Sequence, residues 1–438
     1  MHLCLKDEMT MVGFKRCNGF DRRQILAGFG AFFAAPAAFA APPNALGGGQ
    51  AEWSQGYDSG SRVANVRSNA PILSPSTVQA TEAALQQYQQ IVSQGGFSPV
   101  PRAERLRLGS RSDGVVALRR RLIQGGDLDP SLGSSPVFDA YVEAAIKRFQ
   151  GRHGLGQTGI VAAQTYAAMN MPADKRLRQL EINLVRLRSL ALSNLGARYV
   201  TINIPAAYVE TVENGQVATR HAAGVGKIDR QSPLMSAKIT EVNFNPFWTV
   251  PLSVIRKDLI PKMQADPSYL RDNKIRIFNG TGQELQPEQV NWRSDEALKY
   301  RFRQDQGGEF NSLGFMRINV NSPHGVYMHD TPAKGIFGDD FRFVSSGCVR
   351  VQNVRAYVEW LLKDTPGWDR EAIETAIRSG QRIDAKFREA LFTHWVYITA
   401  WATPEGVVQF RDDIYNRDGF GPGELTRVLQ DKSEDLVE

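Results

Sequence analysis

Apolar side chains recur every three or four residues over long stretches of the first half of the chain, which predicts amphipathic helices. The first such stretch covers residues 76–93, with Ser76 as its candidate N-cap. The last runs over residues 172–195 and places leucines on one face and arginines on the other. Between them, residues 105–171 carry three short apolar stripes, which predict a compact three-helix module.

The period changes to two from Arg198 onward, which predicts strands. Residues 209–212 and 217–219 flank Asn214-Gly215, a strong signal for a two-residue hairpin. The expected fold class is therefore α+β and multidomain: a small helical domain followed by a mainly-β domain.

The N-terminal 40 residues read as an export signal. Arg22-Arg23 precedes an apolar run rich in Ala and Phe that ends at Ala38-Phe39-Ala40, the order of charged region, apolar core and cleavage site. The arginine pair favours twin-arginine export, and the predicted location is periplasmic. The alternative is an uncleaved anchor that leaves the same domains outside the membrane. Residues 41–75, rich in Gly, Ser, Pro and Asn, are expected to be a flexible leader.

Composition and charge restrict the kinds of molecule that the protein is expected to bind. The formal net charge of +6 is too mild for a nucleic-acid-binding protein, and no basic stripe with interleaved aromatic residues is present. A weakly cationic surface suits an acidic polymer such as a cell wall. With 42% hydrophobic residues in 438, the chain has enough apolar material for two or three domains.

Cys348 is the candidate nucleophile. Cys4 and Cys17 fall in the predicted signal, so Cys348 would be the single thiol of the exported protein. An unpaired cysteine kept in an oxidising compartment points to chemistry rather than packing. It follows Gly347, which allows backbone N–H groups to converge as an oxyanion hole requires.

His329 is the candidate base. It lies 19 residues before Cys348, directly after the short apolar strand expected at residues 326–328. His324 is the fallback. Asp330 is discounted as a third catalytic member, because adjacent strand residues point to opposite faces. The His and Cys spacing matches no metal motif, so neither a metal nor another cofactor is expected.

Two parts of the chain resemble known families. Leu118-Arg119-Arg120-Arg121-Leu122, Ala144-Ala145-Ile146-Lys147-Arg148-Phe149-Gln150 and Thr158-Gly159 are similar to the small helical peptidoglycan-binding domain, although that family usually has an acidic residue where this chain has Thr158. The alternative for this module is a spacer bundle without glycan affinity.

The second resemblance covers residues 198–382. Tyr327-Met328-His329-Asp330-Thr331 followed by Ser345-Ser346-Gly347-Cys348-Val349-Arg350 resembles the L,D-transpeptidase catalytic domain. The commoner form has Ser-His-Gly-Cys, and Ser346 replaces that histidine, as in the branch with a binding module and a long insertion. Residues 252–313 would then be a capping insertion.

The remaining predicted segments are a scaffold helix at residues 76–104, a linking helix at 172–197 and a C-terminal extension at 383–438.

The resemblance implies a concrete reaction. Cys348 would attack the carbonyl of the L-centre of diaminopimelate in a stem tetrapeptide and expel D-alanine, with His329 moving the proton. A second diaminopimelate amine would take the acyl group, giving a 3→3 cross-link. The backbone N–H groups of Gly347 and Cys348 would bind the oxyanion, and the backbone of Ser346 would orient His329.

Further roles come with the same resemblance. Arg350 would bind a substrate carboxylate, unless it forms a buried ion pair, and Tyr327 and Trp248 would line the peptide groove. The expected partners are stem peptides, glycan strands and carbapenem-type inhibitors.

Other functions stay open from sequence. An L,D-carboxypeptidase would pass the acyl group to water, and an anchoring transferase would pass it to a wall protein. A non-catalytic peptidoglycan-binding scaffold is a further alternative. A papain-like protease is excluded because its cysteine precedes its histidine.

Overall fold

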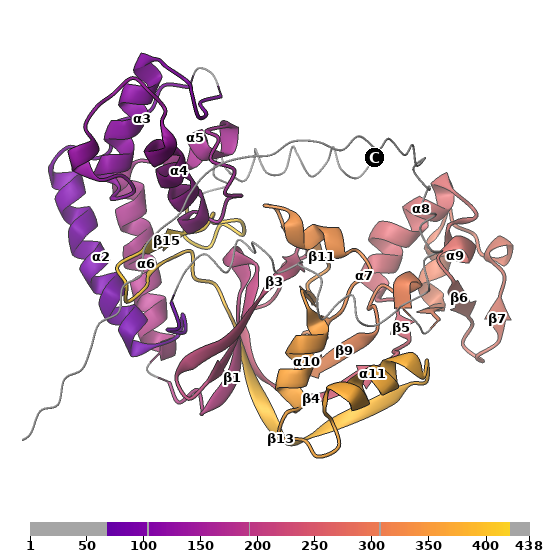
Figure 1. Ribbon diagram of the computed structural model, residues 1–438. Helices are drawn as coiled ribbons and strands as arrows, with labels where there is room; N and C mark the ends of the chain where they lie inside the picture. Colours follow the sequence, from indigo (N-terminus) through magenta and orange to yellow (C-terminus); the bar gives the residue numbers. More distant parts are fainter. Residues whose placement is uncertain (1–67, 103–104, 192, 306–307, 421–438) are drawn as a thin grey trace, which may run out of the picture. The chain divides into compact units, whose positions relative to one another are not determined.

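The computed structural model describes residues 68–102, 105–191, 193–305 and 308–420 (Figure 1). The predicted export signal at residues 1–40 lies outside the described residues. Within the described ranges, no helix combines the length and the apolar character that a bilayer crossing requires.

A nine-stranded sheet forms the centre of the second half of the chain. Its order is β11-β3-β12-β10-β9-β4-β13-β1-β2, and an additional β2–β3 pairing closes the strands from β3 to β2 into a ring. This arrangement, beside separate helices, confirms the α+β prediction. The strands are β1 (Arg198–Asn203), β2 (Tyr208–Glu213), β3 (Gln216–Gly226), β4 (Met235–Phe244), β9 (Met316–Val320), β10 (Met328–His329), β11 (Phe343–Ser345), β12 (Val349–Val351) and β13 (Ile383–Val396).

The β2–β3 hairpin forms where the sequence predicted it. Glu213 pairs with Gln216, and the two turn residues, Asn214 and Gly215, have φ of 50° and 75°. Two positive φ values are what a type I′ turn requires, which is why Asn-Gly is preferred there.

The sheet packs on two helices, α10 (Val354–Leu362) and α11 (Arg370–Arg378). Tyr357, Val358 and Leu361 of α10 are buried in one cluster with strand residues such as Ile202 and Ile318. Their positions fit an apolar stripe with helical spacing. Val349 and Val351 of β12 belong to the same cluster, so this core supports β12 and the cysteine turn just before it.

The boundary predicted at residue 382 is wrong. Strand β13 lies between β4 and β1, so the segment assigned to a C-terminal extension supplies an internal strand of the sheet. A register shift between Lys386 and Leu391 interrupts its pairing with β4. Such an irregularity breaks the two-residue alternation that marks a strand in a sequence. Trp395 belongs to β13, and the chain then continues into a hairpin formed by β14 (Ala400–Ala402) and β15 (Val408–Phe410).

The N-terminal helices largely match expectation. Helix α2 (Pro75–Ser93) packs against α6 (Ala173–Ala191). Its N-cap is Ser74 rather than Ser76, since the Ser74 Oγ accepts a hydrogen bond from the Thr77 N–H at 3.2 Å. Pro75 then occupies the first helical position, where a missing N–H costs nothing.

The end of the predicted leader is packed. Ile72 and Leu73 are each 2% exposed and belong to a cluster with Leu187 and Trp401. The flexible-leader prediction is therefore wrong for residues 68–74, because two large apolar side chains find a core there; residues 41–67 lie outside the described residues.

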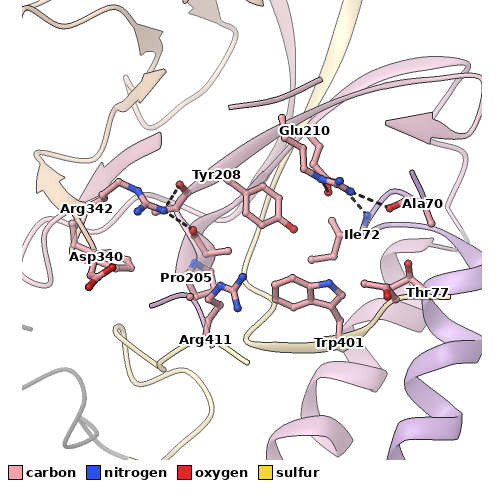
Figure 2. A pocket seen from close by; sticks show the side chains of 16 residues that line it. Ala70, Ile72, Thr77, Pro205, Tyr208, Glu210, Asp340, Arg342, Trp401 and Arg411 are labelled. Carbon is pink, nitrogen blue, oxygen red and sulfur yellow. Dashed lines mark hydrogen bonds and ion pairs between the residues drawn. The ribbon is translucent and has the colours of Figure 1, made fainter. Parts of the chain in front are cut away.

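Polar contacts fix residues 68–74 to the sheet around a small cavity of about 60 Å³ (Figure 2). The Glu210 carboxylate accepts from the Ile72 N–H at 3.0 Å and from the Arg220 Nε at 2.9 Å. Arg342 donates to the carbonyls of Ala206 and Ala207. Main-chain groups and side chains of the protein itself satisfy the charges of Glu210, Arg220 and Arg342. The cavity therefore belongs to the packing between residues 68–74 and the sheet.

The three-helix module consists of α3 (Asp113–Gln124), α4 (Ala140–Arg152) and α5 (Ala163–Met169) around its own apolar cluster. Its last α4 turn contacts the C-terminal hairpin: Arg152 donates to the Val408 carbonyl at 3.4 Å, and Arg411 donates to the Arg152 carbonyl at 3.0 Å.

The predicted capping insertion has its own core and sheet. The sheet order is β5-β8-β6-β7, formed by β5 (Trp248–Thr249), β6 (Ile275–Phe278), β7 (Glu284–Leu285) and β8 (Arg301–Gln304). The helices are α7 (Leu252–Val254), a π-helical turn (Ile255–Leu259), α8 (Ile260–Ala265) and α9 (Tyr269–Asp272). Leu270 and Phe302 are fully buried in its separate apolar cluster, so the insertion is a folded subdomain.

Candidate active site

Parallel pairing of β10 and β12 brings the two sequence motifs together. Met328 pairs with Val349 and His329 with Arg350, and the Val349 N–H donates to the Tyr327 carbonyl at 3.0 Å. The chain between them leaves through a short helix, returns as β11 beside β3, and turns at Ser346-Gly347. Cys348, directly before β12, therefore lies beside the strand that carries His329.

A cavity of about 460 Å³ collects nearly all the predicted site side chains. They come from the cysteine turn, β10, β12 and the cap: Trp248, Tyr327, His329, Ser346, Cys348 and Arg350. Cap residues Val254, Asp258 and Leu259 also form its wall. The insertion is thus part of the cavity rather than a surface decoration.

The position of the His329 ring is set by its neighbour's backbone. Its Nδ1 lies 2.5 Å from the Asp330 carbonyl oxygen. A carbonyl only accepts, so Nδ1 carries the proton and Nε2 keeps its lone pair as a base. The predicted orienting role of Ser346 is therefore wrong: the Asp330 carbonyl orients the ring.

The Asp330 carboxylate does not face the imidazole. Its Oδ2 accepts from the Phe315 N–H at 2.9 Å and its Oδ1 from the Thr331 N–H at 2.7 Å. The side chain is 1% exposed and holds the start of β9 and the turn after β10. Discounting a His-Asp carboxylate pair was correct.

Burial and charge keep the resting His329–Cys348 pair neutral. Burial, then the nearby Arg350 guanidinium, lowers the pKa of His329 to about 3. Burial raises the pKa of the Cys348 thiol, although the Tyr327 N–H, its hydroxyl and the positive charges of Arg317 and Arg350 offset part of that rise. The site therefore holds a neutral imidazole and a protonated thiol at neutral pH, so formation of the thiolate would require proton transfer to His329 when a substrate binds.

Arg317 is a site residue that the sequence reasoning missed. It pairs with His329 across β9 and β10, and its guanidinium lies 4.3 Å from the centre of the Tyr327 ring. The available signal was a cation inside the apolar strand Met316-Arg317-Ile318. His329 thus lies between two arginine-bearing strands, with Arg350 on β12 on its other side.

Gly347 has the backbone conformation that the prediction required, but its N–H is not free to donate to an oxyanion. Its φ is +109°, and a Cβ there would lie 3.3 Å from the Gln231 carbonyl oxygen. Its N–H, however, donates to Ser345 Oγ at 3.1 Å. The predicted Gly347 oxyanion donor is therefore wrong, because the turn itself uses this group.

A polar bridge joins the cap to the cysteine turn. Arg230 Nη1 lies 2.5 Å from Asp258 Oδ2, in the π-helical turn, and donates to Ser346 Oγ at 3.0 Å. Asp258 Oδ1 accepts from Arg230 Nη2 at 3.2 Å. From the same loop as Arg230, Ser232 Oγ donates to the Gly347 carbonyl at 2.9 Å. The loop at residues 227–232 thus contacts the cap and the nucleophile turn together.

The cavity has cations available for an anionic ligand. Among the described residues, Arg350 has no carboxylate within ion-pair distance, and its Nε is buried without an acceptor. This argues against the ion-pair alternative. Lys227 and Lys262 also line the cavity, whereas Asp258 is paired with Arg230.

The remaining candidate base, His324, lines the same cavity but is exposed in a turn, where its N–H donates to Ser322 Oγ. His221 and His394 bind elsewhere: His221 Nδ1 lies 3.0 Å from the Gln352 carbonyl, and His394 Nδ1 lies 2.9 Å from Ser236 Oγ. His329 is therefore the buried imidazole that lines the cavity.

Comparison with known proteins gives two family matches. Residues 197–368 match the model described as the L,D-transpeptidase catalytic domain (YkuD), and residues 111–169 match the model described as "Putative peptidoglycan binding domain". A curated protein of Haemophilus influenzae (strain ATCC 51907 / DSM 11121 / KW20 / Rd), "Putative L,D-transpeptidase", is 33% identical over 242 residues. These cover 55% of this chain and 48% of that protein, so the chain spans about half of that relative's length.

Solved structures of low sequence identity also match. The L,D-transpeptidase (residues 123–326) of Xylanimonas cellulosilytica DSM 15894 is 14% identical, with 68% of this chain and 99% of that chain covered and a TM-score of 0.22. The L,D-transpeptidase of Stackebrandtia nassauensis is 12% identical, with coverages of 68% and 96% and a TM-score of 0.26.

One assignment follows from the site residues, the ring of strands that holds them and the two sequence-family matches. This chain carries a catalytic domain of the L,D-transpeptidase family at residues 197–368 and a helical module of the peptidoglycan-binding-domain family at residues 111–169.

Proposed function

We propose that this protein is an exported L,D-transpeptidase that forms 3→3 peptidoglycan cross-links through a thioester on Cys348. The observation that carries the proposal is the cavity that Cys348 shares with a neutral, oriented His329 beneath a folded cap. The export signal predicted at residues 1–40 and a periplasmic location belong to the same proposal.

In the acylation step, Cys348 Sγ attacks the carbonyl carbon of the L-centre of diaminopimelate in a stem tetrapeptide. His329 Nε2 takes the thiol proton as the S–C bond forms, and then donates it to the nitrogen of the departing D-alanine. The bond that breaks is the amide to D-alanine, and the product is a thioester.

The developing oxyanion needs a donor other than Gly347. The N–H of Cys348 has no acceptor among the described residues, and the Tyr327 hydroxyl, which hydrogen-bonds with the thiol, lies beside it. We assign these two groups to the oxyanion.

In the transfer step, the side-chain amine of a second diaminopimelate attacks the thioester carbonyl. His329 Nε2 accepts a proton from the attacking amine and returns it to the sulfur as the C–S bond breaks. The cap favours an amine over water because it covers the cavity. Arg350, Lys227 and Lys262 supply positive charge for stem-peptide carboxylates.

Two functions of the same chemistry differ only in the acceptor. A carboxypeptidase would use water, and an anchoring transferase would use a protein amine. A non-catalytic scaffold is disfavoured, because a free thiol, an oriented imidazole and an arginine without a carboxylate partner among the described residues line one cavity. Incubation of the mature protein with disaccharide-tetrapeptide, beside Cys348→Ala, separates them by mass spectrometry. A cross-linked dimer lacking one D-alanine supports transpeptidation, whereas tripeptide alone indicates hydrolysis.

Carbapenem-type inhibitors are proposed to acylate the same sulfur. Attack of Cys348 on the strained β-lactam carbonyl opens the ring and leaves an acyl group on the enzyme, with the proton moved by His329. An intact-mass measurement without an adduct, while the thiol still titrates as free, would contradict this.

A further inference from the structure

Arg317 carries a half-buried positive charge that the protein leaves without a counter-ion. It lies in β9, no carboxylate of the described residues is within ion-pair distance of it, and its Nε is buried without a hydrogen-bond acceptor. Its cross-strand partner on β4 is the amide Asn243, which donates to the Asp384 carboxylate at 2.6 Å. A half-buried charge without a partner is unfavourable for folding, so stability alone does not account for an arginine at this position.

The group that Arg317 faces is the aromatic ring of Tyr327. The guanidinium carbon lies 4.3 Å from the centre of that ring, within the range in which a cation is attracted to the negative face of an aromatic ring. The Tyr327 ring also contacts the His329 ring edge to face, with 5.7 Å between the two centres. The described residues that line the cavity of Cys348 include Tyr327 but not Arg317, so Arg317 reaches the site through Tyr327.

Two neighbours fix the direction of the Tyr327 hydroxyl. Its oxygen is hydrogen-bonded to the Trp248 side chain, and the hydroxyl is hydrogen-bonded to the Cys348 sulfur. The indole N–H of tryptophan can only donate, so the oxygen accepts from Trp248 and the hydroxyl proton is left for Cys348. Trp248 belongs to β5 of the cap. The cap thereby holds the hydroxyl as a donor that points at the nucleophile.

The charge of Arg317 strengthens that donor. A phenol donates a stronger hydrogen bond when a nearby positive charge makes its proton more acidic. Burial raises the pKa of Tyr327 and the charge of the Cys348 thiolate raises it further, whereas Arg317 lowers it. Burial likewise raises the pKa of the Cys348 thiol, and Arg317 is one of the groups that lower it. Both effects favour negative charge at the sulfur and at a carbonyl oxygen bound by the Tyr327 hydroxyl.

The same charge opposes proton transfer to His329. Burial, then Arg350 and, to a smaller extent, Arg317 keep the pKa of this imidazole low. Removal of Arg317 would therefore weaken the donor to the oxyanion and make His329 a better base. These two effects change the acylation rate in opposite directions, so the sign of the change shows which of them dominates.

We propose that Arg317 is a positioning residue of the reaction: it holds the Tyr327 ring and strengthens the hydroxyl as a donor to the sulfur and to the oxyanion. Arg317 moves no proton. The Tyr327 hydroxyl keeps its own proton, while His329 carries the one that the thiol loses. The inference rests on the proposed function, because it assigns Arg317 to the acyl transfer at Cys348.

The first test is the rate of Cys348 acylation by disaccharide-tetrapeptide, measured on the mature full-length protein by quenched intact-mass spectrometry. Arg317→Met should lower the maximal rate about tenfold or more, part of the loss expected for removal of an oxyanion donor, with little change in the substrate concentration that gives half of that rate. Arg317→Lys keeps a cation over the ring and should recover most of the rate. Arg301→Met is the matched control: Arg301 is also a strand arginine over an aromatic ring, 5.5 Å from the centre of Phe278, and does not line the cavity.

A double-mutant cycle tests whether Arg317 acts through Tyr327. In a Tyr327→Phe background the hydroxyl is absent, so Arg317→Met should slow acylation by less than about threefold. Equal losses in both backgrounds would overturn the proposal. Faster acylation by Arg317→Met alone would also overturn it, because the charge would then act mainly on His329.

The pH dependence of Cys348 alkylation by iodoacetamide gives a readout that needs no transpeptidation. Arg317→Met should move the midpoint to higher pH, because a positive charge that favours the thiolate is lost, whereas Arg317→Lys and Arg301→Met should leave it near the wild-type value. An unchanged midpoint in Arg317→Met would overturn the proposal. A wild-type enzyme that is not acylated, but whose midpoint responds to Arg317→Met, would refute only the proposed function.

Discussion

At the scale of single residues, the site depends on which groups surround one imidazole. His329 is buried between Arg317 on β9 and Arg350 on β12, and the Asp330 carbonyl holds its Nδ1–H. These contacts fix the ring's tautomer and disfavour the imidazolium. His329 therefore rests as a neutral imidazole, and the thiol remains protonated until a substrate arrives.

The pKa of His329 tests this account. Burial and then Arg350 lower it to about 3, so the imidazole signals should not titrate between pH 5 and 8 in NMR spectra. Arg350→Gln removes the second cause and should shift the pKa upward, with burial still holding it below 6.5. A wild-type titration near pH 6.5 would contradict this account, whereas an imidazole that stays protonated above pH 8 would indicate a thiolate–imidazolium pair.

The two neighbours of His329 also show what sequence reasoning can reach. Cys348 and His329 were predictable because a lone thiol and a histidine after an apolar strand stand out in the sequence. Arg317 and the Asp330 carbonyl were not, since strand register and a backbone atom create those contacts. The Gly347 N–H was misassigned because Ser345 Oγ competes for it.

At the scale of elements, Arg230 joins the cap to the cysteine turn. Its guanidinium contacts Asp258 in the π-helical turn and Ser346 beside the nucleophile, and its own loop supports Gly347. Helix irregularities of this type are frequent at functional sites. We infer that Arg230 positions both elements without touching the reacting atoms.

Loss of the contacts of Arg230 should change how the acyl group is divided between its two acceptors, the diaminopimelate amine and water. Arg230→Met is expected to lower transpeptidation roughly tenfold or more, because small displacements of a reacting group are costly, and to raise the share of hydrolysed product. Product ratios from mass spectrometry provide the readout. Lys257→Met is the control: it breaks the exposed pair with Asp229, which contributes little. Equal product ratios in both variants would refute the positioning role.

At the scale of the whole molecule, β13 shows why the domain limits could not be read from sequence. Ile383 to Lys386 and Leu391 to Trp395 pair with β4 in two registers, so the alternation that marks a strand is broken between them. The prediction of a flexible leader was wrong for a related reason: Ile72 and Leu73 look isolated in the sequence and are buried by residues far along the chain, such as Leu187 and Trp401. The helical module needs no such distant partner, because the apolar stripes of α3, α4 and α5 form its own cluster.

Truncation provides the test at this scale. A chain ending at residue 382 loses β13 and should fail to fold, because an internal strand of the sheet is removed. A chain ending at residue 420 keeps every described element and should give a cooperative thermal transition. Circular dichroism and thermal melting distinguish the two, and a folded, active 382-residue chain would contradict the topology.

The central claim is that Cys348 carries the substrate as a thioester, and acid-quenched intact-mass spectrometry with peptide mapping tests it most directly. After incubation with disaccharide-tetrapeptide, the account predicts a disaccharide-tripeptide acyl adduct on Cys348, removed by hydroxylamine and absent from Cys348→Ala. His329→Gln should accumulate little adduct, because no base takes the thiol proton. Cross-linked product from the Cys348→Ala variant, or an adduct mapped to another residue, would contradict the account.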